Sequence, residues 1–139
     1  MNGANLHQAV YTRLAGFTAL TSQLGTSGVL SSVPQPDEPG DNAAFPYVTF
    51  SFPDLNPFDT DDIDGIEATL RVHVWSRSQS DLKWRRVVDS VYDCLHRYQI
   101  PIAAANTVDC LFTDSTAMDD PDGHTTHAVS TFLITYDGI

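Results

Sequence analysis

Apolar side chains recur at helical spacing in two long stretches of the chain. Residues 5–16 carry them three or four positions apart, which predicts an amphipathic helix with Asn5 as its N-cap, and residues 18–28 suggest a further helical turn. A second long helix is predicted from about residue 81 to residue 98, after a capping-box pattern that begins at Ser78. Its apolar stripe consists of Trp84, Val87, Val88, Val91, Leu95 and Tyr98.

Alternation of apolar and polar residues, the period of a strand with one buried face, marks other segments of the chain. It is unbroken over residues 66–75. The residues expected on the buried face of that strand are Ile66, Ala68, Leu70, Val72 and Val74. Residues 46–52 alternate in the same way, and residues 29–33 are expected to form a short strand that a cluster of prolines ends.

The last third of the chain has the pattern of a β-hairpin. Apolar residues alternate over residues 108–112 and again over residues 128–136, with a turn signal at residues 119–123 between them. In that turn Pro121 presets φ for the second position, and Gly123 accepts a positive φ.

The order of these elements is helix, three strands, helix and two strands. This order predicts the α+β class, with a largely antiparallel or mixed sheet of four to five strands and two main helices packed on one face. At 139 residues the chain is expected to form one domain over residues 1–139.

An aspartate-rich segment interrupts the regular pattern at about residues 53–65. It reads PDLNPFDTDDID over residues 53–64, and its like charges and two prolines favour an exposed, mobile loop over a regular element. Leu55 and Phe58 are apolar residues that find no local core in such a loop. We therefore expect them to dock onto another surface.

The charge of the chain argues against a nucleic-acid-binding function. Acidic residues outnumber basic ones by 18 to 7, which gives a formal net charge of −11 and a pI near 4.4. Sequence-independent binding to phosphates depends on Lys and Arg, whereas an acidic surface lets DNA pass without adhering. Five of the seven basic residues lie in or just before the second long helix, and this segregation favours attraction between subunits. They are Arg77, Lys83, Arg85, Arg86 and Arg97.

Neither the N-terminus nor the cysteines point to export or to a membrane. No secretory signal and no run of about 20 apolar residues is present, so we expect a soluble protein made in a cytosol, with no membrane partner. Cys94 and Cys110 have no metal-ligand or redox spacing, and both are expected to be buried thiols.

Histidine spacing gives no metal site. His124 and His127 lie three positions apart, which places their rings on opposite faces of a strand, and no third ligand accompanies them. A chance surface pair is the favoured interpretation. The other histidines, His7, His73 and His96, are expected to be solvated side chains.

The aspartate clusters do not fit an EF-hand. Alignment of Gly65 or Gly123 with the loop glycine puts Arg71 or Val129 where the bidentate glutamate belongs. Whether the aspartates of residues 59–64 bind cations stays open. Nucleophile, phosphate-loop and dinucleotide motifs are missing as well, so we predict a non-enzymatic protein without catalytic residues, metal or cofactor.

Four short patterns follow one another along nearly the whole chain. The first is the amphipathic helix leading into the proline-punctuated segment, and the second is the FPYVTF strand opening of residues 45–50. The third is LRVHVWSRS at residues 70–78, a strand that ends in Trp-Ser before a helix, and the fourth is the DPDGHTTH turn of residues 120–127. In this order they resemble the tail-completion, or tail-terminator, family of long-tailed phages and gene transfer agents.

The resemblance implies a structural virion protein. Members of the family form a ring, typically of six subunits, at the head-proximal end of the tail, where the ring stops growth of the tail tube. The expected partners are further copies of the chain, the tail tube protein and the head-side connector or stopper protein, with DNA passing through the lumen without specific binding. The resemblance also implies assembly in the host bacterial cytoplasm, and it implies no cofactor and no catalytic residue.

Two helices can cover only one face of a sheet, so the other face must meet water or a neighbour. Arg71, His73 and Trp75 lie on that second face and are expected at subunit contacts, although Trp75 packed under a loop of its own chain is an equal alternative. The remaining residues expected at contacts are Leu55, Phe58, Asp61 and Asp62 of the acidic segment and Arg85 and Arg86 of the basic helix.

Two other functions stay open at this point. The first is a different head–tail connector or tail-tube subunit of the same particle. The second is a small acidic metal-binding protein or enzyme unrelated to phages.

Overall fold

The computed structural model describes residues 3–25, 28–30, 45–57, 64–77, 81–102, 105–121, 123 and 125–138. The helices within these ranges are α1 (Gly3–Gly16), α2 (Thr18–Thr21) and α3 (Asp81–Leu95). The strands are β1 (Val29–Leu30), β2 (Tyr47–Pro57), β3 (Asp64–Ser76), β4 (Ala105–Asp119) and β5 (Thr126–Gly138).

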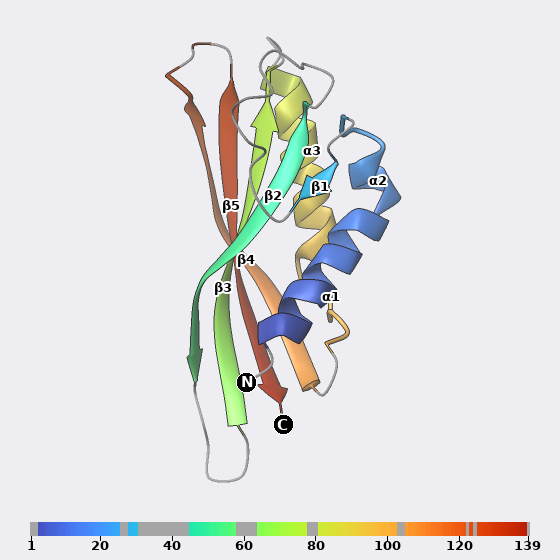
Figure 1. The fold of residues 1–139 in the computed structure, drawn as a ribbon, viewed down its shortest axis with the longest axis vertical. Coiled ribbons are helices and arrows are strands. Elements are labelled where there is room, and N and C mark those ends of the chain that lie inside the picture. Colours follow the sequence, from blue (N-terminus) through green and yellow to red (C-terminus); the bar gives the residue numbers. More distant parts are fainter. Residues whose placement is uncertain are drawn as a thin grey trace.

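The five strands form one mixed sheet in the order β1-β2-β3-β5-β4. The short strand β1 runs parallel to β2, and every other pair is antiparallel. The three helices lie together on one side of this long, twisted sheet (Figure 1). The predicted α+β class and the packing of the helices on one face are confirmed.

The hydrophobic core fills the space between the helices and the sheet. The five alternating residues of β3 predicted to face inward are all buried, and they meet the inward residues of β5, such as Phe132 and Ile134. From the other side, Leu6, Val10 and Leu14 of α1 enter the core completely. A fully buried side chain of this size stabilises the fold by about 1.5–3 kcal/mol, so the amphipathic stripes provide much of the folding energy. From α3 the buried residues are Trp84, Val87, Val91, Cys94 and Leu95.

The helix boundaries differ from the predicted ones by a few residues. The helix α1 begins at Gly3, so Asn5 lies inside its first turn and is not the N-cap. The helix α3 ends at Leu95, three residues early, because Arg97 takes a left-handed φ of 58° that a helix cannot continue through. The capping-box residue Ser78 lies outside the described residues.

The aspartate-rich segment was expected to be a loop over residues 53–65, and this expectation is wrong for more than half of it. The strand β2 continues to Pro57 and β3 begins at Asp64. A bulge between Ser51 and Asp54 absorbs Pro53, and within the described ranges β1 pairs only with the start of β2, so the prolines break no hydrogen bond to a described outer strand. Residues 58–63 lie outside the described residues.

The hairpin turn and the cysteines follow the sequence patterns. The amide of Gly123 donates to Asp120 O at 3.1 Å, and Gly123 has a φ of 82°. Both cysteines are free and buried, as predicted. Burial raises the pKa of the Cys94 thiol to about 11 and that of Cys110 to about 12. Thiols held this firmly in the neutral form are poor nucleophiles.

Candidate subunit-contact surfaces

The face of the sheet opposite the helices is the first candidate surface, and we call it the open face. It carries the outward residues of each strand, including Arg71, which is exposed, and His73 and Trp75, which are partly buried. Arg71 pairs across β3 and β5 with Thr131 in the strand register. The structure therefore places the three predicted contact residues of β3 on one surface that no described helix covers.

A row of rings crosses the open face near the end of β3. The Trp75 indole stacks on the imidazole of His127 with ring centroids 3.8 Å apart and planes 8° apart. On its other side lies Tyr47 of β2, with a centroid distance of 6.2 Å. The Trp75 Nε1–H donates to Thr49 Oγ1 at 3.1 Å. Trp75 is thus in contact with neighbouring strands of its own sheet on both sides of its ring.

His73 and His127 form a hydrogen-bonded pair within this row. His73 Nδ1 lies 2.7 Å from His127 Nε2, so one ring donates its N–H and the other accepts through a bare nitrogen. The accepting imidazole must be neutral. Burial lowers the pKa of His73 below 6.5, with the charges of His127 and Arg71 acting in the same direction. Burial also lowers the pKa of His127, against an opposing contribution from Asp120.

This pair corrects two predictions about the histidines. His73 is not a free solvated side chain, and the partner of His127 comes from the neighbouring strand, while His124 lies outside the described residues. His96 is also engaged, because its Nδ1 accepts the backbone N–H of Phe112 at 3.0 Å. His7 remains exposed, as expected, beside the Phe50 ring.

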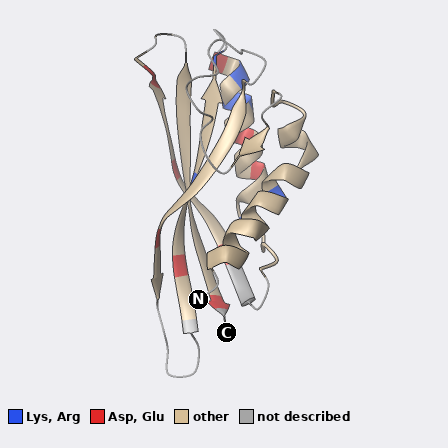
Figure 2. Ribbon diagram, viewed as in Figure 1, with Lys and Arg blue, Asp and Glu red and all other residues tan. Residues whose placement is uncertain are grey.

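Basic side chains gather in one part of the molecule, whereas acidic side chains are spread along its length (Figure 2). Exposed acidic residues such as Asp54 and Glu67 lie at the end of the sheet where β2 passes toward β3. The basic residues gather on the first two turns of α3, at the opposite end (Figure 2). Lys83, Arg85 and Arg86 are all exposed there. The basic helix predicted from the sequence is thus a localised basic patch on an otherwise acidic molecule.

A groove between α3 and β4 is the second candidate surface. Its volume is about 730 Å³, and it is bounded by one side of α3 and by the inward-facing side of β4. The lining residues are Trp84, Arg85, Val88, Asp89, Tyr92, Phe112, Ser115 and Ala117. Aromatic and aliphatic groups form its floor, whereas Arg85 and Asp89 carry its charge.

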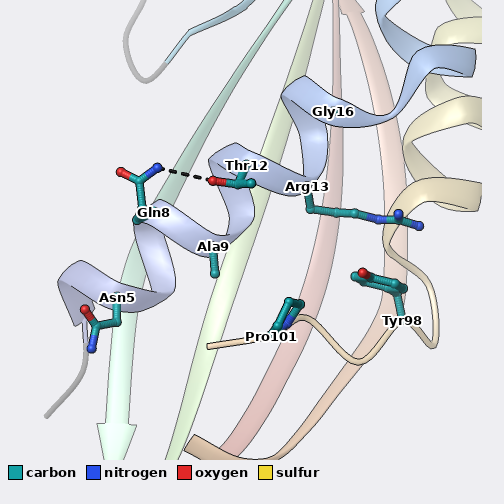
Figure 3. Close-up of a pocket in the computed structure, with 8 residues that line it drawn as sticks. All are labelled: Asn5, Gln8, Ala9, Thr12, Arg13, Gly16, Tyr98 and Pro101. Atoms are coloured by element: carbon teal, nitrogen blue, oxygen red, sulfur yellow. Dashed lines mark hydrogen bonds between the residues drawn. The ribbon is translucent and has the colours of Figure 1, made fainter. Parts of the chain in front are cut away.

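A second hollow, of about 410 Å³, lies between α1 and the segment after α3 (Figure 3). Its one charged lining residue, Arg13, donates from Nε to Cys94 O at 2.9 Å, near the end of α3. The guanidinium also lies 3.7 Å from the centroid of the Tyr98 ring. Arg13 thus satisfies a carbonyl at a helix C-terminus and stacks on an aromatic ring, which is a structural role.

The described residues were also compared with the patterns of metal sites and of membrane-spanning helices. No three His, Cys, Asp or Glu side chains among them converge as metal ligands. Within the same part of the chain, no helix has the length and apolar character needed to cross a bilayer.

A family model described as Tail completion protein gp17 matches residues 8–137. The chain belongs to this family. It is therefore a structural protein of phage-type tails, and the family resemblance found in the sequence is confirmed. A solved chain from the "Virion of native gene transfer agent (GTA) particle" has the same fold, with a TM-score of 0.83 and 18% sequence identity. The similarity covers 99% of this chain and 98% of that chain. No protein with a curated description matches the sequence.

In this tail completion protein the predicted contact residues do not lie on one surface. Arg71, His73 and Trp75 share the open face, whereas Arg85 and Arg86 lie on α3 on the opposite side of the sheet. Phe58, Asp61 and Asp62 lie outside the described residues.

For Leu55, another predicted contact residue, the expected surroundings were wrong. It pairs with the buried Ala68 across the sheet, so it faces the helices and packs against the core. Leu55 lies close to the start of α1, because a Cβ atom added to Gly3 would be 3.7 Å from Leu55 Cδ2. The sequence carried a signal for this position, because Leu55 continues the alternation of β2 once the bulge at Pro53 is allowed for.

Sequence reasoning missed the groove between α3 and β4. Its aromatic floor joins Tyr92 and Phe112, whose rings meet edge to face at 5.2 Å, although the two residues come from different elements. Tyr92 lies beside the buried stripe of α3, and Phe112 is the last inward residue before a bulge in β4. The sequence did carry one signal for the groove. The residues after Phe112 are mostly polar, which is unusual for a strand face that a helix covers.

Proposed function

We propose that this protein forms a ring at the head-proximal end of the tail, where it ends growth of the tail tube and joins the tube to the head-side connector. The observation that carries the proposal is membership of the tail completion family over residues 8–137. The protein acts through its surfaces and carries out no catalytic reaction. Its partners are further copies of itself, the tail tube protein and the connector or stopper protein of the head.

The fold supports assembly into a closed ring. The open face and the groove are different surfaces, on opposite sides of the sheet, so a contact between them on two copies is heterologous. Head-to-tail contacts of this kind close into a ring when the rotation between copies returns to its start. We propose six copies per ring, located in the tail of the virion after assembly in the host cytoplasm.

The charge of the chain supports a passive lumen. A surface with a net charge of −11 per copy repels phosphates, so DNA leaving the head passes through the ring without specific binding. The ring's function then depends on shape and on contacts between proteins.

The deciding experiment is an image of particles that lack this protein. The genes that encode the particle are expressed with and without the gene for this protein. Tail length and the attachment of heads are then measured by electron microscopy. The proposal predicts overlong tails and tails without heads, both restored by the wild-type chain supplied in trans. Tails of normal length joined to heads in its absence would contradict the proposed function.

A further inference from the structure

The outer edge of β4 is closed in its first half by the end of α3. The amide of Arg97 donates to Cys110 O at 2.7 Å, and the amide of Phe112 donates to His96 Nδ1 at 3.0 Å. Residues of an antiparallel edge strand turn their N–H and C=O alternately toward the neighbouring strand and away from it, so these bonds identify Cys110 and Phe112 as outward residues. The end of α3 thus takes the place of a further strand along this part of β4.

The second half of the same edge is open. On β5 the partners of Ser115 and Ala117 lie two and four residues from the partner of Phe112, so all three belong to the same class of pair. Ser115 and Ala117 therefore turn N–H and C=O outward, as Phe112 does. Within the described ranges no residue bonds to these outward groups, and residues 115–119 are all exposed. They span roughly 17 Å, which is enough for the pairing of one added strand.

A strand added at this edge presents its side chains to two different surroundings. On the helix side it lies beside Ala117, at the border of the groove whose floor includes Tyr92 and Phe112. The lining of that groove carries one arginine and one aspartate, so apolar side chains are favoured on this side. On the side of the open face the strand meets Asp114, which is exposed and level with Thr131 of β5. A basic side chain opposite Asp114 is favoured there, whereas an acidic one is repelled.

A second copy of this chain is a poor source for such a strand. Its net charge is −11, and the outer side of β2, its other exposed edge among the described residues, carries Asp54 and the prolines at positions 53 and 57. Pro57 belongs to the same class of pair as Val48, whose amide donates outward to Gly28 O, but proline has no N–H to donate. The edge of β4 thus suits an extended segment of a different protein.

We propose that residues 115–119 of β4 bind an extended segment of another protein of the particle as an added strand, with apolar side chains toward the groove and basic side chains toward Asp114. Backbone hydrogen bonds at Ser115 and Ala117 supply the affinity, and the alternation of side chains supplies the specificity. The inference rests on the proposed function, because it requires that tail or head proteins meet this one in the particle. Pairing stops where His96 and Arg97 already occupy the edge.

The chemistry of the contact is tested on the purified full-length protein with the peptide acetyl-Lys-Val-Lys-Val-Lys-Val-amide. Saturating peptide should slow amide hydrogen exchange at Ser115 and Ala117 by about tenfold or more in NMR, because these amides gain acceptors. The amides of Asp114 and Thr116 face β5 already and should change little. A peptide with Glu in place of each Lys should bind at least about threefold more weakly.

A pair of variants at one position tests the backbone contact. Ala117→Pro lacks the outward N–H but removes no bond to β5, whereas Ala117→Val keeps that N–H at the same place. The peptide should bind Ala117→Val and fail to bind Ala117→Pro, with urea unfolding used to show that both variants are folded. Equal binding by the two folded variants, tighter binding of the Glu peptide, or unchanged exchange at Ser115 and Ala117 in the wild-type protein overturns the inference.

The source of the strand is tested in particles. The photoreactive residue p-benzoylphenylalanine replaces Met118, beside the open part of the edge, or Leu111, which is similarly exposed on the same face of β4 but beside the part that α3 closes. Irradiation should link position 118 to a different protein of the particle, identified by mass spectrometry, several times more efficiently than position 111. Equal yields from both positions, or links from position 118 to a second copy alone, contradict the inference. Such results leave the proposed function intact, because that is decided separately by tail length in particles lacking the protein.

Discussion

One residue just after α3, where the chain leaves the helix, has an unfavourable backbone conformation. Arg97 has a φ of 58°, in the left-handed region where a Cβ atom is unfavourable, and its amide donates to Cys110 O at 2.7 Å. The hydrogen bond ties the end of α3 to β4, and it needs only the backbone. The side chain itself is exposed and forms no hydrogen bond or ion pair with another described residue.

Arg97→Gly should therefore stabilise the protein by ~0.5–1 kcal/mol, because glycine accepts positive φ and keeps the amide donor. The free energy of unfolding in urea measures the change. Gln99→Gly, at an exposed position without a positive φ, is the control and should be neutral or destabilising. A loss of stability in Arg97→Gly equal to that of the control would show that the left-handed backbone is not strained.

At the level of elements, the pairing of β3 with β5 brings His73 and His127 together and makes stability depend on pH. Both histidines have a pKa lowered below 6.5 by burial, so the folded state favours their neutral forms. Above pH 6.5 the imidazoles are neutral in both states and this contribution is fully present. As the pH falls below 6.5, the unfolded chain takes up protons first, and stability is lost until the lowered folded-state pKa is passed.

Wild-type protein should consequently lose stability between pH 7 and pH 5 more steeply than the variant His73→Gln/His127→Gln. Arg71 and Asp120, the charged groups that act on the pair, are retained in both proteins. The difference between the two proteins at each pH, obtained from urea unfolding, isolates the imidazoles from the carboxylates. Parallel pH profiles would mean that the pair does not titrate as described.

The elements also mark where prediction from the sequence stops. The buried faces of β3 and α3 could be predicted because each repeats with its own period, which depends on nothing outside the element. That residues 53–57 form part of a strand could not be predicted in this way. Proline is accepted in a strand mainly at a bulge or at an edge, and neither feature can be seen in the local sequence. Likewise His73 and His127 are 54 residues apart in the sequence, and they meet only because of the register in which β3 pairs with β5. The periodicity of a single strand carries no information about that register.

At the scale of the whole molecule, the open face and the acidic segment are proposed to act together in ring assembly. Replacing Trp75 with Ala and Phe58 with Asp should prevent ring formation in native mass spectrometry while far-ultraviolet circular dichroism shows a folded chain. Thr69→Ala, which changes a small side chain on the same face, is the matched control and should assemble normally. Rings that persist with both substitutions would place the contacts elsewhere.

The same charge balance predicts how the protein treats DNA. Eighteen acidic against seven basic residues leave too few cations to release counterions from a duplex, so the purified chain should not retard linear DNA in a gel at any salt concentration. Substitution of Lys for the aspartates at positions 59, 61 and 62 provides the comparison, since it raises the net charge by six. Retardation by wild-type protein that weakens with added salt would contradict a passive lumen.

Within the described part of the chain the outer edge of β4 has no neighbouring strand, which has a consequence for isolated copies of the protein. A strand of 15 residues whose outer side pairs with no other described strand invites pairing with any extended chain. The register shift between Phe112 and Asp114 breaks the regular spacing of that edge, and exposed aspartates flank it at positions 109 and 119. Smoothing the bulge and neutralising these charges should therefore turn a storable subunit into one that forms fibrils.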